Sequence, residues 1–253
     1  MALLDGKVAI VTGGGQGVGE GIALALAGEG VALVIADKNL DTAERTARKI
    51  AERGGRAVSL RCDVCAPADI AATVERAMAE FGGIDILVNN AQGVHLGPLL
   101  NHGDDAFADS FDSGPFATFR FMKATYPHMK ARGGGAIVNL ATAGAVMWDQ
   151  KGYGLYAGAK QAIRTLSRTA AHEWALDGIR MNTICPVAMT PSMDWWFETD
   201  PTSANAWIKG LPISRIGDPE LDIGRAVVFL VGPDARYVTG VTLPVDGGQA
   251  NFG

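Results

Sequence analysis

Short apolar runs alternate along the chain with segments that have helical spacing. Seven runs rich in Val, Ile, Leu and Ala are predicted to be strands, at 7–12, 31–36, 57–62, 84–89, 136–140, 179–184 and 241–245. Between them the spacing predicts helices at 18–27, 41–53, 67–81, 116–130, 155–175 and 221–231. Strands that are apolar throughout and alternate with helices indicate an α/β fold with a parallel sheet covered on both faces.

The strand and helix pattern runs the length of the chain without an internal repeat, a low-complexity tract or a linker. Residues 1–253 are therefore expected to form one domain. Pro244 removes a hydrogen-bond donor from the last predicted strand, which places that strand at a sheet edge. Between about 188 and 217 neither pattern is clear, and an irregular segment of this length is typical of a functional lid or loop.

Composition and charge narrow the class of protein. The chain has 253 residues, 48% of them hydrophobic, and a net charge of −5, so nothing in its charge favours nucleic acid or an anionic membrane. No apolar run approaches the roughly 18 residues of a membrane span. The N-terminus resembles the start of a strand rather than a signal peptide, and three cysteines give no disulfide framework, which together predict a cytoplasmic protein. Cys62 and Cys65 resemble half of a zinc site, but no second pair follows, so no metal is expected.

A glycine-rich segment, 12–19 (TGGGQGVG), lies between the first predicted strand and the first predicted helix. In that context glycines let the backbone approach a pyrophosphate, while the helix directs its N–H groups and dipole at the anion. Asp37 closes the second strand, where a carboxylate can bind the adenosine ribose hydroxyls and would repel a 2′-phosphate. Lys38 could partly neutralise such a phosphate. The segment predicts a dinucleotide site that favours NAD over NADP.

Tyr156 and Lys160 stand four residues apart in a predicted helix and therefore on one face of it. A tyrosine with a pKa of about 10 is a poor acid or base at neutral pH. A nearby ammonium favours the phenolate and would lower that pKa toward the working range. The pair could then give a proton to a carbonyl or take one from an alcohol, although a Tyr-x3-Lys spacing by itself also arises by chance on helix surfaces.

Several motifs occur together in a fixed order: the glycine segment at 12–19, NNA at 89–91, Tyr156-x3-Lys160 and VDGG at 245–248. Smaller matches are CDV at 62–64, IVN at 137–139 and YVTG at 237–240. Over essentially its whole length the chain closely resembles the short-chain dehydrogenases/reductases. The resemblance implies a Rossmann-like doubly wound parallel sheet of about seven strands with helices on both faces. It also implies hydride transfer with a nicotinamide cofactor, and a homo-oligomer, tetramer or dimer, built on the two long helices after the fourth and fifth strands.

The resemblance also implies roles for single residues. Tyr156 would donate and accept the proton, while Lys160 would bind the nicotinamide ribose and lower the pKa of Tyr156. The cofactor-binding set would be Gly13, Gln16, Gly17, Val18, Gly19, Asp37, Lys38, Asp63, Val64, Asn89, Ala91, Tyr156, Lys160, Pro186 and Val187. Within it, Asp63 and Val64 would flank the adenine, and Asn89 and Ala91 would lie along the ribose. Asp63 could instead cap the helix that begins near Pro67.

The chain departs from the family pattern at four positions near the expected site. Thr142 replaces the usual serine and keeps a hydroxyl beside an added methyl. Gly114 stands where an asparagine usually sustains a water-linked relay, so Ser113, or a carbonyl freed by a kink at Gly114-Pro115, is the predicted substitute. Gln92 and Val187 replace glycines and would narrow or reshape the site. The predicted catalytic set is Tyr156, Lys160, Thr142, Ser113 and Gly114.

The segment at about 188–217 covers the substrate in this family and is rich in aromatic residues here. It is predicted to be an apolar lid over a bulky or cyclic alcohol or ketone. The predicted substrate-contacting residues are Gln92, Trp148, Tyr153, Trp195 and Trp196. Alternatively, these aromatic side chains pack against the core or against a second subunit.

The predicted activity is that of an NAD-dependent alcohol dehydrogenase/ketone reductase. Two rival hypotheses remain. A non-catalytic dinucleotide-binding protein is suggested by the changes at Gly114, Gln92 and Val187. An enzyme of the same architecture could instead use bound NAD for epimerisation or dehydration.

Overall fold

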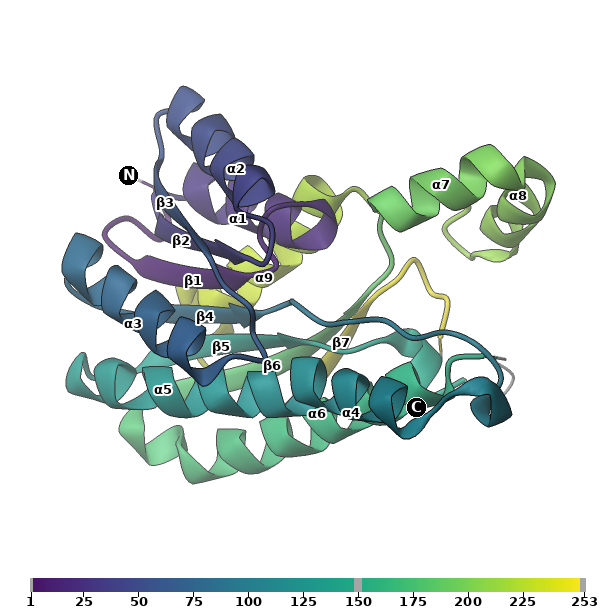
Figure 1. The fold of residues 1–253 in the computed structure, drawn as a ribbon. Coiled ribbons are helices and arrows are strands. Elements are labelled where there is room, and N and C mark those ends of the chain that lie inside the picture. Colours follow the sequence, from purple (N-terminus) through teal and green to yellow (C-terminus); the bar gives the residue numbers. More distant parts are fainter. Residues whose placement is uncertain (1, 148–151, 251–253) are drawn as a thin grey trace.

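Seven parallel strands form one sheet at the centre of the molecule, as Figure 1 shows. The computed structural model describes residues 2–147 and 152–250. The strands are β1 (Val8–Thr12), β2 (Ala32–Asp37), β3 (Arg56–Arg61), β4 (Ile86–Asn89), β5 (Gly135–Leu140), β6 (Ile179–Pro186) and β7 (Thr242–Val245). Their order across the sheet is β3-β2-β1-β4-β5-β6-β7. The predicted α/β fold with a doubly wound parallel sheet is confirmed.

Helices cover both faces of the sheet (Figure 1). The described helices are α1 (Gly17–Gly28), α2 (Leu40–Glu52), α3 (Pro67–Phe81), α4 (Asp104–Phe111), α5 (Ala117–Ala131), α6 (Gly154–Glu173), α7 (Pro191–Thr199), α8 (Pro201–Gly210) and α9 (Arg225–Val231). The helices α1, α2 and α9 pack on one face, and α3, α5 and α6 pack on the other. Within the described residues, no helix is both long enough and apolar enough to cross a membrane.

The two hydrophobic cores follow from the alternation of side chains along apolar strands. In β1, Ala9 and Val11 belong to the core beneath α1 and α9, while Ile10 belongs to the core beneath α3, α5 and α6. Successive residues of a strand point to opposite faces, so a strand between two helical layers must be apolar at every position. This requirement is why the strands were recognisable as continuous apolar runs.

The order of the strands determines where a ligand can bind. β1 pairs with β2 on one side and with β4 on the other, so the chain reverses its direction of travel across the sheet at this point. In open α/β sheets, ligands bind outside the carboxyl ends of the strands at such a switch point. At the far edge, β7 pairs with β6, which confirms the edge position predicted from Pro244.

The helix predicted at 116–130 is longer than its sequence pattern indicated. It begins with α4 and continues into α5 through a π-helical turn at Asp112–Phe116. Pro115 lies within that turn. A π-turn displaces the local hydrogen bonds, so a proline without an N–H can be accommodated without ending the helix. The irregularity predicted at Gly114-Pro115 is therefore present as a π-turn.

The prediction that 188–217 has no regular structure is wrong, because this segment contains α7 and α8. Thr190 and Asp200 are the N-caps of these helices, and each is followed by a proline at the first helical position. Thr190 accepts a hydrogen bond from the N–H of Met193, and Asp200 accepts one from the N–H of Ser203. Capping side chains followed by proline are a recognised start signal for helices. In Figure 1 the two helices project from the body of the molecule.

Candidate active site

The glycine-rich turn between β1 and α1 lets the backbone come close to a ligand. Gly13 and Gly17 have φ angles of +61° and +54°, a region that glycine adopts without strain. A Cβ at Gly19 would lie 2.1 Å from the carbonyl oxygen of Gly13. Gln16, the N-cap of α1, makes no side-chain hydrogen bond to the helix, so the N–H groups of Gly17, Val18 and Gly19 lack a capping side chain. This arrangement suits a diphosphate.

Asn90 holds the glycine turn against the end of β4. Its Nδ2 donates to the carbonyl oxygens of Thr12 (3.0 Å) and Gly13 (2.9 Å), and its backbone N–H donates to Thr12 Oγ1 (3.0 Å). Asn90 was not among the predicted site residues, although it lies inside the NNA motif. Its bonds fix the two strand ends at the switch point relative to each other.

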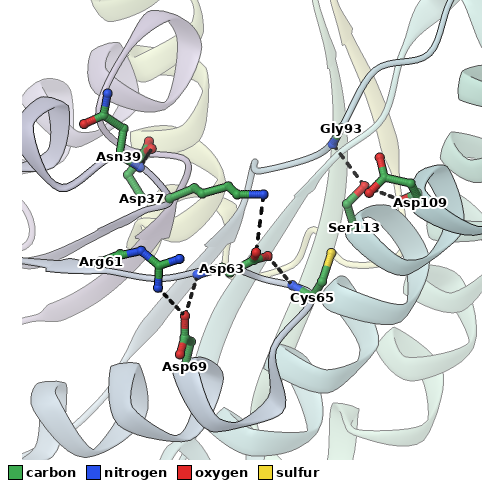
Figure 2. Close-up of polar contacts among 10 residues, drawn as sticks. Asp37, Asn39, Arg61, Asp63, Cys65, Asp69, Gly93, Asp109 and Ser113 are labelled. Carbon is green, nitrogen blue, oxygen red and sulfur yellow. Dashed lines mark hydrogen bonds and ion pairs between the residues drawn. The ribbon is translucent and has the colours of Figure 1, made fainter. Parts of the chain in front are cut away.

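Asp37 connects the end of β2 to the glycine turn. Its Oδ2 accepts a hydrogen bond from the N–H of Gly15 at 2.9 Å. Its Oδ1 accepts one from the N–H of Asn39 at 3.0 Å (Figure 2). Arg45 also reaches this turn, because α2 brings its Nη2 to within 3.1 Å of the carbonyl oxygen of Gly15. Arg45 was not among the predicted site residues, because it lies in the helix after Asp37 and not beside it in the sequence.

Asp63 follows β3, and Lys38 follows the neighbouring strand β2. The two side chains form an ion pair, at 3.3 Å from Lys38 Nζ to Asp63 Oδ2 (Figure 2). A hydrogen bond from the N–H of Cys65 and the neighbouring ammonium of Lys38 lower the pKa of the Asp63 carboxyl. The N-cap of α3 is Ala66, so the alternative in which Asp63 caps this helix is wrong. Val64, the next residue, is buried.

Asn89 is buried at the end of β4. Its Nδ2 donates to Asn139 Oδ1 at 2.8 Å, a buried bond that joins β4 to β5. The amide nitrogen of Asn89 is therefore engaged inside the sheet. Pro186 and Val187 lie at the carboxyl end of β6, on the same edge of the sheet.

Tyr156 and Lys160 lie together on the first turns of α6. The Nζ atom of Lys160 is 5.5 Å from the centroid of the Tyr156 ring. Lys160 is buried and donates a hydrogen bond of 2.7 Å to the carbonyl oxygen of Leu140 at the end of β5. The ring of Tyr153 meets that of Tyr156 edge-on, with centroids 6.2 Å apart. The predicted pair is thus assembled beside the carboxyl ends of the strands.

Burial shifts the pKa values of Tyr156 and Lys160. Burial raises the pKa of Tyr156 to about 12, with a smaller contribution from Tyr153. Burial also lowers the pKa of Lys160 to about 7. The predicted effect of Lys160 on the pKa of Tyr156 stays a prediction, because burial is the largest contribution to the pKa of each group. Burial disfavours the charged form of each group, and Nζ of Lys160 donates to the carbonyl of Leu140.

Thr142 stands just after β5, two residues beyond Leu140. Its Oγ1 accepts a hydrogen bond from the N–H of Gly144 at 3.2 Å and begins a short 3₁₀ turn, Ala143–Ala145. A hydroxyl that accepts one bond can still donate its proton. The structure thus brings a hydroxyl to the strand end that Lys160 also contacts.

The hydroxyl of Ser113 makes two hydrogen bonds. Its Oγ donates to the carbonyl oxygen of Asp109 at 2.7 Å and accepts from the N–H of Gly93 at 3.0 Å, as Figure 2 shows. The side chain therefore ties the loop after β4 to the π-turn. Gly114 is next to it, and the carboxamide of Gln92 lies against Gly114.

The predicted lid begins directly beside the glycine turn. Pro191, the first residue of α7, has its Cδ 3.5 Å from where a Cβ of Gly17 would lie. Trp195 is 65% exposed, whereas the Trp196 ring packs on Trp207 of α8 with centroids 5.6 Å apart. The aromatic residues of this segment thus pack partly on one another. Trp148 lies outside the described residues.

Comparisons with known proteins agree with this geometry. A family model described as enoyl-(acyl carrier protein) reductase matches residues 13–250. The 12α-hydroxysteroid dehydrogenase of Clostridium sp. is 42% identical over 98% of this chain and 98% of its own length. The chain belongs to the short-chain dehydrogenase/reductase family. As its relatives are dehydrogenases and reductases, it is an oxidoreductase of that family.

Other members of the short-chain dehydrogenase/reductase family are similar over the same length. The 2,5-dichloro-2,5-cyclohexadiene-1,4-diol dehydrogenase LinX of Sphingobium indicum is 33% identical over 97% of this chain and 96% of its own. A solved structure of 7α-hydroxysteroid dehydrogenase, complexed with NADH and 7-oxo glycochenodeoxycholic acid, superposes with a TM-score of 0.91 at 33% identity. That match covers 98% of this chain and 95% of the other.

Proposed function

We propose that the protein is an NAD-dependent dehydrogenase that interconverts a secondary alcohol and a ketone on a bulky, cyclic, largely apolar substrate of the hydroxysteroid class. The observation that carries this proposal is the placement of Tyr156 beside Lys160, next to the carboxyl ends of the strands and to a glycine turn suited to a diphosphate. Full-length similarity to a 12α-hydroxysteroid dehydrogenase supports the substrate class.

The residues present fit a dinucleotide. The glycine turn and the start of α1 would hold the diphosphate, and Asp37 would bind the adenosine ribose. Asp63 and Val64 would border the adenine, and Lys160 would contact the nicotinamide ribose. When bound, the nicotinamide supplies the carbon that accepts or donates a hydride.

NAD is favoured over NADP by the charges near the end of β2. Asp37 would repel a 2′-phosphate, and the ammonium of Lys38 is paired with Asp63. Arg45 is the feature that favours NADP, since its guanidinium reaches the carbonyl of Gly15. We expect a lower KM for NAD than for NADP. An Asp37→Ser substitution should bring the KM for NADP closer to the KM for NAD. An unchanged ratio of these two KM values would contradict the role of Asp37.

Tyr156 exchanges the hydroxyl proton. With its pKa raised to about 12, the phenol carries its proton at neutral pH and can donate it to a ketone oxygen. In the reverse direction the phenolate accepts the proton of the alcohol, so oxidation should become faster as the pH rises. Thr142 would position the substrate oxygen through its hydroxyl.

The lid formed by α7 and α8 would cover the substrate. The carboxamide of Gln92, which was predicted to contact the substrate, is buried. Trp195 is the most exposed aromatic side chain of the lid, and together with Tyr153 it would supply contacts to the ring system. Trp148 was predicted to join them. An exposed aromatic residue beside a cofactor site suits a substrate with a large apolar surface.

Absorbance of reduced nicotinamide tests the proposal. The panel should contain steroids with hydroxyl or keto groups at different ring positions, cyclohexadiene diols and simple secondary alcohols, each with NAD and with NADP. We expect turnover with at least one steroid and NAD. Cofactor binding without turnover on any substrate would favour a non-catalytic binding protein, and product formation without release of reduced cofactor would favour epimerisation or dehydration.

We also propose that the protein is a homo-oligomer. Phe107, Phe116 and Phe119 are exposed along the helix formed by α4 and α5, and exposed aromatic side chains are enriched at subunit interfaces. Sedimentation velocity should give a dimer or tetramer, and Phe119→Glu should reduce its size. A monomeric wild-type protein would contradict this proposal.

A further inference from the structure

Three buried polar atoms lack a hydrogen-bond partner near the candidate site. They are Nε2 and Oε1 of Gln92 and Oγ of Ser110, and among the described residues no other buried side-chain nitrogen or oxygen lacks one. An unsatisfied buried polar atom costs about 1–3 kcal/mol. Native proteins pair nearly all such atoms with protein groups, ligands or ordered water. We therefore expect a bound group that forms hydrogen bonds with both the nitrogen and the oxygen of the Gln92 carboxamide.

The carboxamide of Gln92 fills the space that a side chain at position 114 would need. A Cβ added to Gly114 would lie 2.9 Å from Gln92 Nε2 and 3.0 Å from its Cδ. Ser110 is four residues before Gly114 on the same helix, and positions at this spacing lie roughly 5–6 Å apart. The Ser110 hydroxyl therefore lies on the side of the helix that the Gln92 carboxamide contacts.

The backbone on both sides of Gln92 is fixed. On one side Asn90 is bonded to the carbonyls of the glycine turn. On the other, the N–H of Gly93 donates to Ser113 Oγ, which in turn donates to the carbonyl of Asp109 (Figure 2). The loop therefore joins the glycine turn to the π-turn, and the π-turn packs against α6, which carries Tyr156. A side chain held in this way is preorganised.

We propose that Gln92 is a positioning residue whose carboxamide, together with the Ser110 hydroxyl, binds an ordered water molecule between the loop after β4 and the helix α4–α5. The inference rests on the proposed function, because this water lies beside α6 and supports proton transfer at Tyr156. The departures from the family pattern at positions 92 and 114 are then related. Gln92 in the loop supplies the polar side chain, and Gly114 in the helix supplies none.

Substitutions at positions 92 and 114 test this proposal. Gln92→Leu keeps the approximate volume but removes the amide, and should lower kcat about tenfold, the effect of losing a hydrogen bond worth about 1.4 kcal/mol. The KM for NAD should be unchanged, and the pH profile of kcat should shift. Gly114→Asn alone should also lower kcat, because its Cβ would meet Gln92. The double variant Gln92→Gly/Gly114→Asn should recover the activity lost in Gly114→Asn.

A high-resolution crystal structure of the wild-type protein provides a readout that does not depend on activity. We expect a water within hydrogen-bond distance of both Gln92 and Ser110. The inference would be overturned if Gln92→Leu had the wild-type kcat and pH profile. It would also be overturned if Gly114→Asn lowered kcat equally in the presence of Gln92 and in the Gln92→Gly background. A crystal structure in which the carboxamide is bonded to protein groups alone would overturn it as well. Absence of turnover on every substrate would instead overturn the proposed function, and the crystal structure would still decide the water site.

Discussion

Burial changes the acidity of Lys160 and Tyr156 in opposite directions. It lowers the pKa of the lysine to about 7 and raises that of the tyrosine to about 12, because both groups lose solvation of their charged forms. The sequence spacing predicted that the two residues would be neighbours, which the structure bears out. It could not predict how densely the surrounding strands would enclose them, because that depends on residues distant in sequence such as Leu140.

The depressed pKa of Lys160 predicts a pH-dependent stability. Between pH 7 and about 10.4 the unfolded state binds a proton that the folded state does not, so the free energy of unfolding should rise with pH in this window. Lys160→Met should remove this rise, which is on the order of 3–5 kcal/mol. Urea unfolding of both proteins at the two ends of the window measures it. Parallel stability curves would contradict the assignment.

At the scale of elements, the strands and helices in contact with the sheet could be predicted from the sequence, and the helices away from it could not. Strands buried on both faces are continuous apolar runs, and α3 was predicted with its observed bounds, Pro67–Phe81. The helices α7 and α8 were missed because they pack on each other and not on the core. Among their residues Ala204 is buried in α8 and none is buried in α7, so no apolar stripe marks them. Their only signal was the pair of caps, Thr190 and Asp200, each with a proline after it.

The close approach within the glycine turn predicts different outcomes for two glycines of α1. Gly19→Ala should destabilise the fold by about 2–4 kcal/mol and abolish NAD binding, because its Cβ would meet the carbonyl of Gly13. Gly28→Ala is the matched control, since nothing lies within 4 Å of its Cβ, and should be neutral or stabilising by up to about 1 kcal/mol. Thermal unfolding and fluorescence titration with NADH measure both effects. Equal effects of the two substitutions would contradict the account of the turn.

The aromatic contact between the lid helices predicts a selective effect on substrate binding. Trp207→Ala removes the partner of Trp196, a contact worth about 0.5–1.5 kcal/mol, and should raise the KM for the steroid while leaving that for NAD unchanged. Trp174→Ala is the control, because Trp174 packs on Tyr126 away from the lid. It should lower stability without changing either KM. An unchanged steroid KM in Trp207→Ala would contradict the lid function.

At the scale of the whole molecule, the two ends of the sheet have different tasks. The carboxyl ends carry the candidate site, and the amino ends carry an ion-pair cluster centred on Asp85. This carboxylate, with 6% of its side chain exposed, pairs with Lys7 and Arg132 and accepts the N–H of Val8. The cluster draws its members from separate parts of the chain, so no local sequence pattern could have predicted it.

This division predicts that stability and catalysis can be changed separately. Asp85→Ala leaves the buried N–H of Val8 and the partly buried guanidinium of Arg132 without this partner, and should cost about 2–4 kcal/mol, with kcat unchanged below the unfolding temperature. Glu80→Gln, in the exposed pair with Arg76, should change stability by less than about 1 kcal/mol. Calorimetry and steady-state kinetics measure the two quantities. A fall in kcat that accompanies Asp85→Ala would show that the two ends are coupled.

The most direct test of the central claim is the rate of NAD reduction by the best alcohol of the substrate panel, in wild type, Tyr156→Phe and Tyr126→Phe. The Tyr126 hydroxyl donates to Asp177 on another part of the surface, so its loss controls for removal of a phenol elsewhere. Tyr156→Phe should lower kcat by about 10²–10⁴ with NAD binding retained, while Tyr126→Phe should keep wild-type turnover. Wild-type turnover in Tyr156→Phe would contradict the assignment of this phenol as the group that exchanges the substrate's proton.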